Sequence, residues 1–442
     1  MKKTVIVFYA EGYCDQVAYA LKEYYAKKAD EVSLLLINEK QYTSFNTRAL
    51  KDGLYKFSMR NWPAINRFCG YISYQYKEKI KNKKAKNAKE AQREDVVIEK
   101  PDKEESFKKL KTKLRKMDNI LLRFNPDVVV CTTPVSLEKA LRARERLGSS
   151  VQIVVPITDY CTNRGMINNG VDKFIVQNAN IKQTLIAFGI KEENIEIIGT
   201  PIVSSVLEKF DRNAVLDEFG VVNKDLPVTV IASGRCGCSR VIDGFKDLAP
   251  YSNEMNIIVF ANNSQNIHSF VKSYVKASKV QQNIYLLDSV STMAKIFSVA
   301  DVLVTSPTAA ITYEASVRGI PCVLLKPANL LEEGNFSYLS TNGFAFIGEK
   351  TTHLVPNVLS LIKKQNPDGT PLKVKTPSEF NAQKYGDFII SIIPEDAQEK
   401  KAKSQARRKA AMEKALKDSE ENEDKEDKAD KKKKAKEAKA KK

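Results

Sequence analysis

One carboxylate stands on a predicted helix that is otherwise built from small and apolar residues. The run SPTAAITYEASVRGIPCVLLKP (306–327) follows an apolar strand predicted over 301–306, and it places Glu314 one turn inside a helix predicted over 310–318. Ligands of open α/β sheets bind beyond the carboxyl ends of the strands. A glutamate at that depth can accept two hydrogen bonds from the neighbouring hydroxyls of a ribose. The alternative interpretation is an ordinary helix glutamate on a solvated face.

A second loop offers backbone donors rather than side chains. The sequence SGRCGCSR (233–240) follows a strand predicted over 228–233 and contains Gly234 and Gly237 just before a helix. Backbone N–H groups and the dipole at a helix N-terminus can hold a phosphate. Many strand–helix turns contain glycine, so this pattern alone is weak. The Cys-x-Cys pair inside the loop has no second pair and no nearby histidine, which favours a tight loop over a metal site.

Short apolar, β-branched runs predict the strands that position these loops. They lie at 4–10, 31–38, 127–133, 151–158, 173–178, 195–201, 228–233, 256–262, 283–288, 301–306, 321–327 and 344–349. The runs are continuous rather than alternating, which is typical of parallel strands buried on both faces. Helical stretches lie between most of them, so the fold class is α/β. The series divides near Pro201 into six strands and six, which predicts two doubly wound domains of similar size.

Positive charge is concentrated in two segments. The chain has 72 Lys and Arg against 54 Asp and Glu, a formal charge of +18, of which 77–116 carries +8 and 396–442 carries +6. The rest of the chain is nearly neutral, which argues against nucleic acid as a partner. The segment 396–442 is rich in Lys, Glu and Ala and has no aromatic residue, so we expect a disordered tail.

The segment 43–76 interrupts the strand–helix alternation. It gathers eight aromatic residues among Lys and Arg, directly before the basic stretch. Such a surface suits a lipid interface; the alternative is an amphipathic helix pair in a domain core. No apolar run approaches 18 residues, so we expect no transmembrane helix. The N-terminal sequence predicts a first strand rather than a signal peptide, and seven dispersed cysteines favour a reducing cytoplasm.

Four features in 154–202 occur together in a known order. They are T-D-[YF] at 158–160, VDKF at 171–174, an amphipathic helix at 179–188 and I-x-G-x-P-I at 197–202. In these features the chain resembles the glycolipid glycosyltransferases, namely the processive diacylglycerol glucosyltransferases and the monogalactosyldiacylglycerol synthases. The run 306–327 with the residues after it is similar to the sugar-nucleotide segment of that family.

The resemblance implies a GT-B fold, in which two Rossmann-like doubly wound domains face each other across a cleft. The implied parts are an acceptor and membrane-contacting domain at 1–200 with the aromatic-basic segment and insertion at 43–116, a UDP-sugar-binding domain at 201–377, a helix returning to the first domain at 378–395, and the disordered tail at 396–442. The implied reaction moves a hexose from a UDP-sugar to diacylglycerol or a related lipid, with inversion and without a metal or other cofactor. The implied location is the cytoplasmic, anionic inner face of the cell membrane, as a peripheral protein.

The resemblance also assigns site residues. Glu314 matches the ribose-binding glutamate of the family. Three other segments match positions at which the family binds the UDP-sugar. They are the diphosphate loop (Ser306, Thr308, Ala309, Ala310), the stretch that holds the sugar hydroxyls (Glu332, Asn335) and the loop after the first strand of the second domain (Ser233, Gly234). Tyr13 and Cys14 stand where the family has Gly-His, so Asp15 and Asp159 are the candidates for the catalytic base. For Asp159 the alternative is a turn-capping role.

Other positions also depart from the family pattern. SPTA at 306–309 stands in place of K-P-G-G, and Leu331 precedes Glu332 in place of a Gln-Glu pair. These departures support a second hypothesis, a catalytically degenerate GT-B protein that binds a nucleotide sugar or a partner without transfer. A third class, the UDP-N-acetylglucosamine epimerases, would need acid–base carboxylates in the same cleft.

Overall fold

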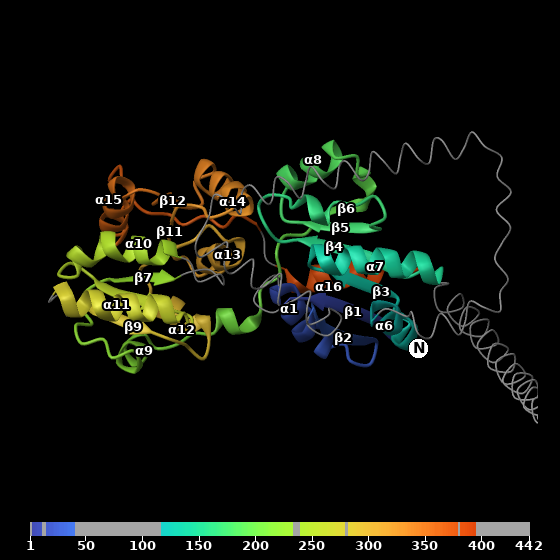
Figure 1. Ribbon diagram of the computed structural model, residues 1–442, viewed down its shortest axis with the longest axis horizontal. Coiled ribbons are helices and arrows are strands. Elements are labelled where there is room, and N and C mark those ends of the chain that lie inside the picture. Colours follow the sequence, from blue (N-terminus) through green and yellow to red (C-terminus); the bar gives the residue numbers. More distant parts are fainter. Residues whose placement is uncertain are drawn as a thin grey trace, which may run out of the picture.

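The chain forms two lobes, each built on one six-stranded sheet whose paired strands are all parallel (Figure 1). The computed structural model describes residues 2–10, 15–39, 116–232, 239–278, 282–378 and 381–394. The predicted α/β class with two doubly wound sheets is confirmed. The segment 43–116 apart from Lys116, the tail 396–442, and Ser233 and Gly234 lie outside the described residues.

The first sheet has the strand order β2-β1-β3-β4-β5-β6. Its strands are β1 (Lys3–Tyr9), β2 (Val32–Asn38), β3 (Val128–Cys131), β4 (Gln152–Ile157), β5 (Lys173–Val176) and β6 (Ile195–Ile197). The helices of this part of the chain are α1 (Asp15–Ala26), α6 (Lys116–Phe124), α7 (Pro134–Leu147) and α8 (Ala179–Ala187), with short turns η1 (Arg164–Met166) and η2 (Glu192–Asn194). The next turn, η3 (Ser204–Leu207), packs against the core of the second sheet. Strand β3 is buried along its whole length, as expected for a strand covered on both faces.

The second sheet has the strand order β12-β11-β10-β7-β8-β9. Its strands are β7 (Val228–Ala232), β8 (Asn256–Phe260), β9 (Ile284–Leu287), β10 (Val302–Thr305), β11 (Cys322–Leu324) and β12 (Phe346–Ile347). Its helices are α9 (Arg212–Glu218), α10 (Ser239–Leu248), α11 (Gln265–Ser278), α12 (Met293–Val299), α13 (Ala309–Val317), α14 (Leu330–Thr341) and α15 (Thr351–Leu361), with the turn η4 (Ala249–Tyr251). This order, in which the chain starts at a central strand and winds outward in both directions, is that of a dinucleotide-binding fold.

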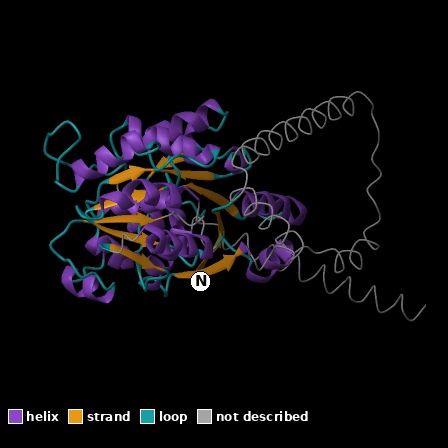
Figure 2. Ribbon diagram, turned by 60° about the vertical axis from the view of Figure 1, so that its left-hand side comes forward, coloured by secondary structure: helices purple, strands orange, loops and turns teal. Residues whose placement is uncertain are grey.

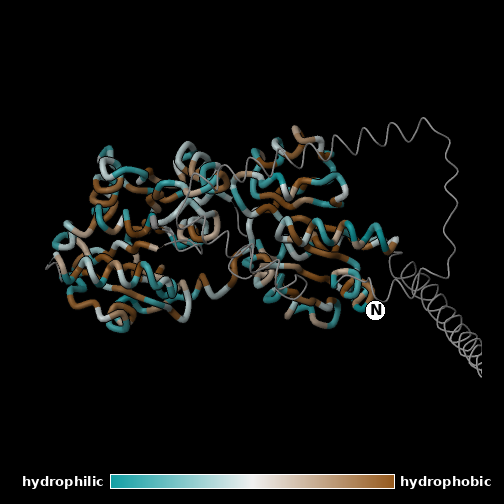
Figure 3. Tube along the Cα trace, in the orientation of Figure 1, coloured by the Kyte–Doolittle hydropathy of each residue, from teal (hydrophilic) through white to brown (hydrophobic). Residues whose placement is uncertain are grey.

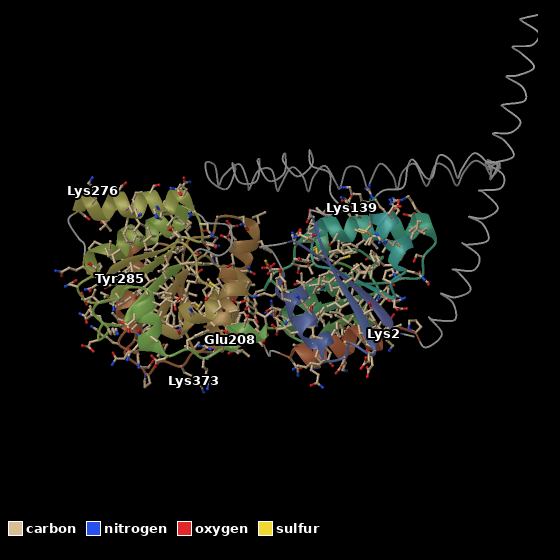
Figure 4. All side chains as sticks on the ribbon, turned by 90° about the horizontal axis from the view of Figure 1, so that it is seen from below. Lys2, Lys139, Glu208, Lys276, Tyr285 and Lys373 are labelled. Atoms are coloured by element: carbon tan, nitrogen blue, oxygen red, sulfur yellow. The ribbon has the colours of Figure 1, made fainter. Side chains whose placement is uncertain are left out.

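Helices cover both faces of each sheet, and the apolar residues lie between the layers (Figures 2 and 3). Each sheet has one hydrophobic cluster on either face. In the described ranges no helix is long and apolar enough to cross a membrane. Figure 4 shows Glu208 close to the junction of the lobes, whereas Lys276 and Tyr285 lie far from it.

The last described helix, α16 (Ala382–Ser391), packs against α1 in the first lobe (Figure 1). The Tyr25 hydroxyl donates to the Gly386 carbonyl over 2.8 Å, and Lys28 forms an ion pair with Asp387 over 2.7 Å. Gly386 lies so close to the Tyr24 ring that a Cβ atom would collide with it. The chain therefore crosses from the second lobe back to the first beyond α15.

Candidate active site

Each sheet reverses its winding beside its first strand. In the first lobe the reversal lies between β1 and β3, and in the second it lies between β7 and β10. Ligands of such sheets bind outside the carboxyl ends of the strands at this point. The loop after β7 lies outside the described residues, so the roles of Ser233 and Gly234 stay predictions.

The loop after β10 leads into the first turn of α13. Ser306 is buried at the end of β10, and Thr308 is the N-cap residue of α13, with no side-chain hydrogen bond to the helix. Ala309 and Ala310 form the first positions of α13 and add little bulk. The first N–H groups of a helix have no intrahelical partners, and the helix dipole favours an anion there. This end of α13 therefore has the backbone donors that a diphosphate would need.

Glu314 lies one turn further along α13, on the same face as Ala310 because the two are four residues apart. The residue has an exposed fraction of 8%, so the alternative of a solvated helix glutamate is wrong. Gln16, on α1 of the other lobe, donates a hydrogen bond from Nε2 to Glu314 Oε1. The carboxylate is thus held where the two lobes meet.

Two further residues that are predicted to bind the sugar hydroxyls lie on α14. Glu332 is buried, and its Oε2 accepts from the Ala328 backbone N–H over 2.8 Å. Burial raises the pKa of Glu332, while the bond from Ala328 and the charge of Arg240 lower it. Asn335 is also buried, and both ends of its amide bond to the other lobe: Oδ1 accepts from Tyr160 N over 2.8 Å, and Nδ2 donates to Asp159 Oδ1 over 3.0 Å.

The loop that follows β4 and the helix α14 form a tight contact between the lobes, which we call the interlobe clasp (159–161 with 331–338). The Cys161 thiol donates to the Leu331 carbonyl over 3.3 Å, and a Cβ atom at Gly334 would collide with Cys161. The rings of Tyr160 and Tyr338 stack with centroids 5.1 Å apart. Such stacking adds about 0.5–1.5 kcal/mol to the gain from burial. The clasp joins the candidate base Asp159 to the candidate sugar-binding residue Asn335.

The two candidate bases lie at the carboxyl ends of first-lobe strands. Burial raises the pKa of Asp159 to about 6, and the hydrogen bond from Asn335 acts in the opposite direction. A general base works best when its pKa is close to the working pH. A small pocket beside Asp159 is lined in part by Thr132 and Thr158. Asp15 is the buried first residue of α1, directly before Gln16.

Sequence reasoning missed Gln16 and the ring pair of the clasp. Gln16 lies in an ordinary first helical turn, and its contact with Glu314 spans 298 positions of sequence, so no local pattern could reveal it. Tyr338 was likewise indistinguishable from a core aromatic residue. Among the described residues, no group of three or more His, Cys, Asp or Glu side chains is placed to hold a metal ion.

Comparison with known sequences agrees with the motifs. The sequence model of the monogalactosyldiacylglycerol (MGDG) synthase family matches residues 15–202. The chain is 21% identical over 248 residues to a processive diacylglycerol beta-glucosyltransferase of Bacillus licheniformis, covering 56% of this chain and 63% of the relative. It is 19% identical over 295 residues to the Bacillus subtilis protein of the same name, covering 66% and 75%. The chain thus spans slightly less than two thirds of the first of these relatives.

Solved structures agree with the fold at still lower identity. A putative UDP-N-acetylglucosamine 2-epimerase from Listeria monocytogenes matches with a TM-score of 0.57 at 11% identity, covering 90% of this chain and 98% of that one. The UDP-GlcNAc 2-epimerase of Neisseria meningitidis gives 0.54 at 13%, covering 88% and 99%. A glycosyltransferase from Rickettsia africae gives 0.51 at 11%, covering 94% and 99%. At these identities the likeness concerns the fold, which is GT-B.

The predicted resemblance is therefore confirmed by the sequence comparisons, and the predicted fold is confirmed by the architecture of both lobes. With a family match over residues 15–202 and matches near 20% identity, the chain is similar to the glycolipid glycosyltransferases of the MGDG synthase and diacylglycerol glucosyltransferase type.

Proposed function

We propose that this protein transfers a hexose from a UDP-sugar to diacylglycerol or a related lipid. The reaction would invert the anomeric carbon and require no metal, and the protein would act as a peripheral protein at the cytoplasmic face of the membrane. The relatives named as diacylglycerol glucosyltransferases support the lipid acceptor. A structural neighbour bound to UDP-GlcNAc supports the nucleotide sugar.

The observation that carries the proposal is the buried carboxylate of Glu314 at the reversal point of the second sheet. A buried charge persists only where donors compensate for the lost water. In the proposed complex the two ribose hydroxyls supply these donors, and the nearby first turn of α13 binds the diphosphate. Ser306, Thr308, Ala309 and Ala310 would line this turn.

The chemistry follows from these placements. The acceptor hydroxyl oxygen forms a bond to the anomeric carbon while the bond from that carbon to the UDP oxygen breaks, and UDP leaves with the electron pair. The backbone N–H groups at the start of α13 stabilise the charge that develops on the diphosphate. The acceptor proton passes to a carboxylate. Asp159 is the stronger candidate, because its pKa of about 6 lets it be ionised and still basic near neutral pH; Asp15 is the other.

One observation favours the second hypothesis, binding without transfer. The polar atoms of Asn335 are both bonded to the first lobe, and Glu332 bonds to the backbone beside it. Sugar hydroxyls would have to replace these bonds. A degenerate protein could keep the two-lobed fold and the nucleotide site. It would no longer exchange these hydrogen bonds for bonds to the sugar hydroxyls, as transfer requires.

Two measurements on the full chain test both hypotheses. Calorimetry with UDP, UDP-glucose and UDP-galactose measures binding, and a coupled assay measures UDP release with and without vesicles of diacylglycerol and anionic phospholipid. Transfer predicts that vesicles containing diacylglycerol accelerate UDP release. Binding with no such acceleration would favour the degenerate protein.

The variant Glu314→Gln keeps the side-chain volume and removes the charge. We expect it to weaken UDP binding about tenfold or more, because a lost hydrogen bond to a charged group costs about 1.5–3 kcal/mol. Glu349→Gln is the matched control, since Glu349 is an exposed carboxylate of the same lobe. UDP affinity that Glu314→Gln leaves unchanged, both in the wild-type chain and in a chain that also carries Gln16→Ala, would remove Glu314 from the nucleotide site and the proposal with it.

A further inference from the structure

The proposed nucleotide carboxylate is already bonded to the opposite lobe. Gln16, the second residue of α1, donates from Nε2 to Glu314 Oε1. The exposed fractions of the two residues are 5% and 8%. Because α1 follows β1 and α13 follows β10, the bond connects the reversal points of the two sheets, which are the places where ligands of such sheets bind.

The chemistry of this bond matches that of the proposed ligand. A ribose diol would donate hydroxyl hydrogens to the Glu314 carboxylate, and the primary amide of Gln16 donates N–H to the same group. Burial of a carboxylate costs free energy unless a hydrogen-bond donor replaces the lost water. Gln16 supplies such a donor and thereby allows the lobes to meet around Glu314 without a nucleotide.

We propose that Gln16 is an internal competitor of the nucleotide. Its bond to Glu314, which we call the latch, holds the lobes together in the ligand-free protein and must break before the ribose binds Glu314. This inference rests on the proposed nucleotide-binding role of Glu314. The apparent Kd for the nucleotide is the intrinsic Kd divided by the fraction of protein in which the latch is open. If the latched form is favoured about tenfold, the apparent affinity falls about tenfold.

The latch is separate from the interlobe clasp. The clasp uses the loop after β4 and α14, whereas the latch uses α1 and α13. Removing Gln16 therefore leaves the clasp contacts in place, while the Glu314 oxygen that accepts from Gln16 loses this competitor of the ribose. The opposite arrangement, in which Gln16 orients Glu314 toward the ribose, predicts weaker binding when Gln16 is removed.

The test is UDP binding by calorimetry to the full chain carrying Gln16→Ala or Gln16→Leu. Leucine keeps most of the side-chain volume but has no donor, so it guards against a packing defect. We expect both variants to bind UDP about three- to tenfold more tightly than the wild type. Lys22→Ala, an exposed change on the same helix, should leave the affinity unchanged.

A second measurement reports on the lobes directly. The Cys161 thiol is partly buried in the clasp against Gly334, and its alkylation by iodoacetamide can be followed by peptide mass spectrometry. We expect the rate at Cys161 to rise several-fold in Gln16→Ala without nucleotide, because the lobes lose the hydrogen bond between α1 and α13.

The outcomes separate the latch from the function on which it rests. Unchanged or weaker UDP binding in both Gln16 variants, with thermal unfolding as in the wild type, overturns the latch. If Glu314→Gln still loses UDP affinity in that case, the nucleotide site stands without the latch. Because Glu314→Gln also weakens the latch, the double variant Gln16→Ala/Glu314→Gln is compared with Gln16→Ala, and equal UDP affinity of these two proteins removes both proposals.

Discussion

The variant Asn335→Leu tests whether Asp159 acts as the base and whether the clasp controls it. Burial raises the pKa of Asp159 to about 6, while the hydrogen bond from Asn335 Nδ2, over 3.0 Å, lowers it. Leucine has a similar volume and keeps water out, but it has no donor. The ionised form of Asp159 then loses its stabilising partner, and its pKa should rise further.

The magnitude follows from the lost bond. A hydrogen bond to a charged group contributes about 1.5–3 kcal/mol, and 1.36 kcal/mol corresponds to one pKa unit, so the expected rise is about one to two units. A general base works in its deprotonated form. If Asp159 is the base, we expect the acid limb of kcat/KM against pH to have its midpoint at about 6 in the wild type and to move in the alkaline direction in the variant.

The assay is vesicle-dependent UDP release measured between pH 5 and pH 9. We expect Asn335→Leu to lose most of its activity at pH 6.5 and to recover much of it at pH 9. Asn342→Leu is the control, since Asn342 is exposed and lies just beyond the end of α14, and its profile should match the wild type. A midpoint that stays in place would show that Asp159 is not the base, and an equal loss at every pH would then leave Asn335 a role in sugar binding or packing alone.

Three further variants probe the same contacts. Asp159→Asn should abolish transfer yet stabilise the fold by about 1–2 kcal/mol at pH 7.5. The pKa of Asp159 is raised from 3.8 to about 6, so the wild type loses stability as the pH rises from 3.8 to about 6 and does not regain it above that pH. Denaturation at pH 3.5, where the carboxyl is mostly neutral, should show little gain. Gly334→Ala should speed Cys161 alkylation and slow transfer, because the new methyl collides with Cys161. Gly386→Ala should destabilise the protein by about 1–3 kcal/mol in urea through its collision with Tyr24; alanine favours helix over glycine by about 1 kcal/mol, so a more stable variant would contradict this packing.

The sequence predicted the architecture because each strand is a short run of apolar, β-branched residues that can be recognised without knowing its neighbours in space. Each apolar run became a strand, including the two-residue β12. The ends were less predictable: the run 195–201 supplies a strand only to Ile197, since Gly199 has a φ of 91° and Pro201 has no N–H to donate. Motif spacing also located Glu314. It could not supply Gln16, because the pairing exists only once two separately encoded lobes meet.

The same reasoning bears on whether the protein transfers sugar. Glu314 and Asn335 both bond to the opposite lobe, which at first favours a protein that no longer takes substrate. Yet each of these bonds can be replaced by a substrate hydroxyl of the same donor or acceptor type, and such an exchange costs little net free energy, because one hydrogen bond replaces another. These hydrogen bonds between the lobes therefore weaken substrate binding without preventing it. The distinction lies in the base: a degenerate protein would show tighter UDP binding in Gln16→Ala but no UDP release at any pH, whereas an active enzyme would show both.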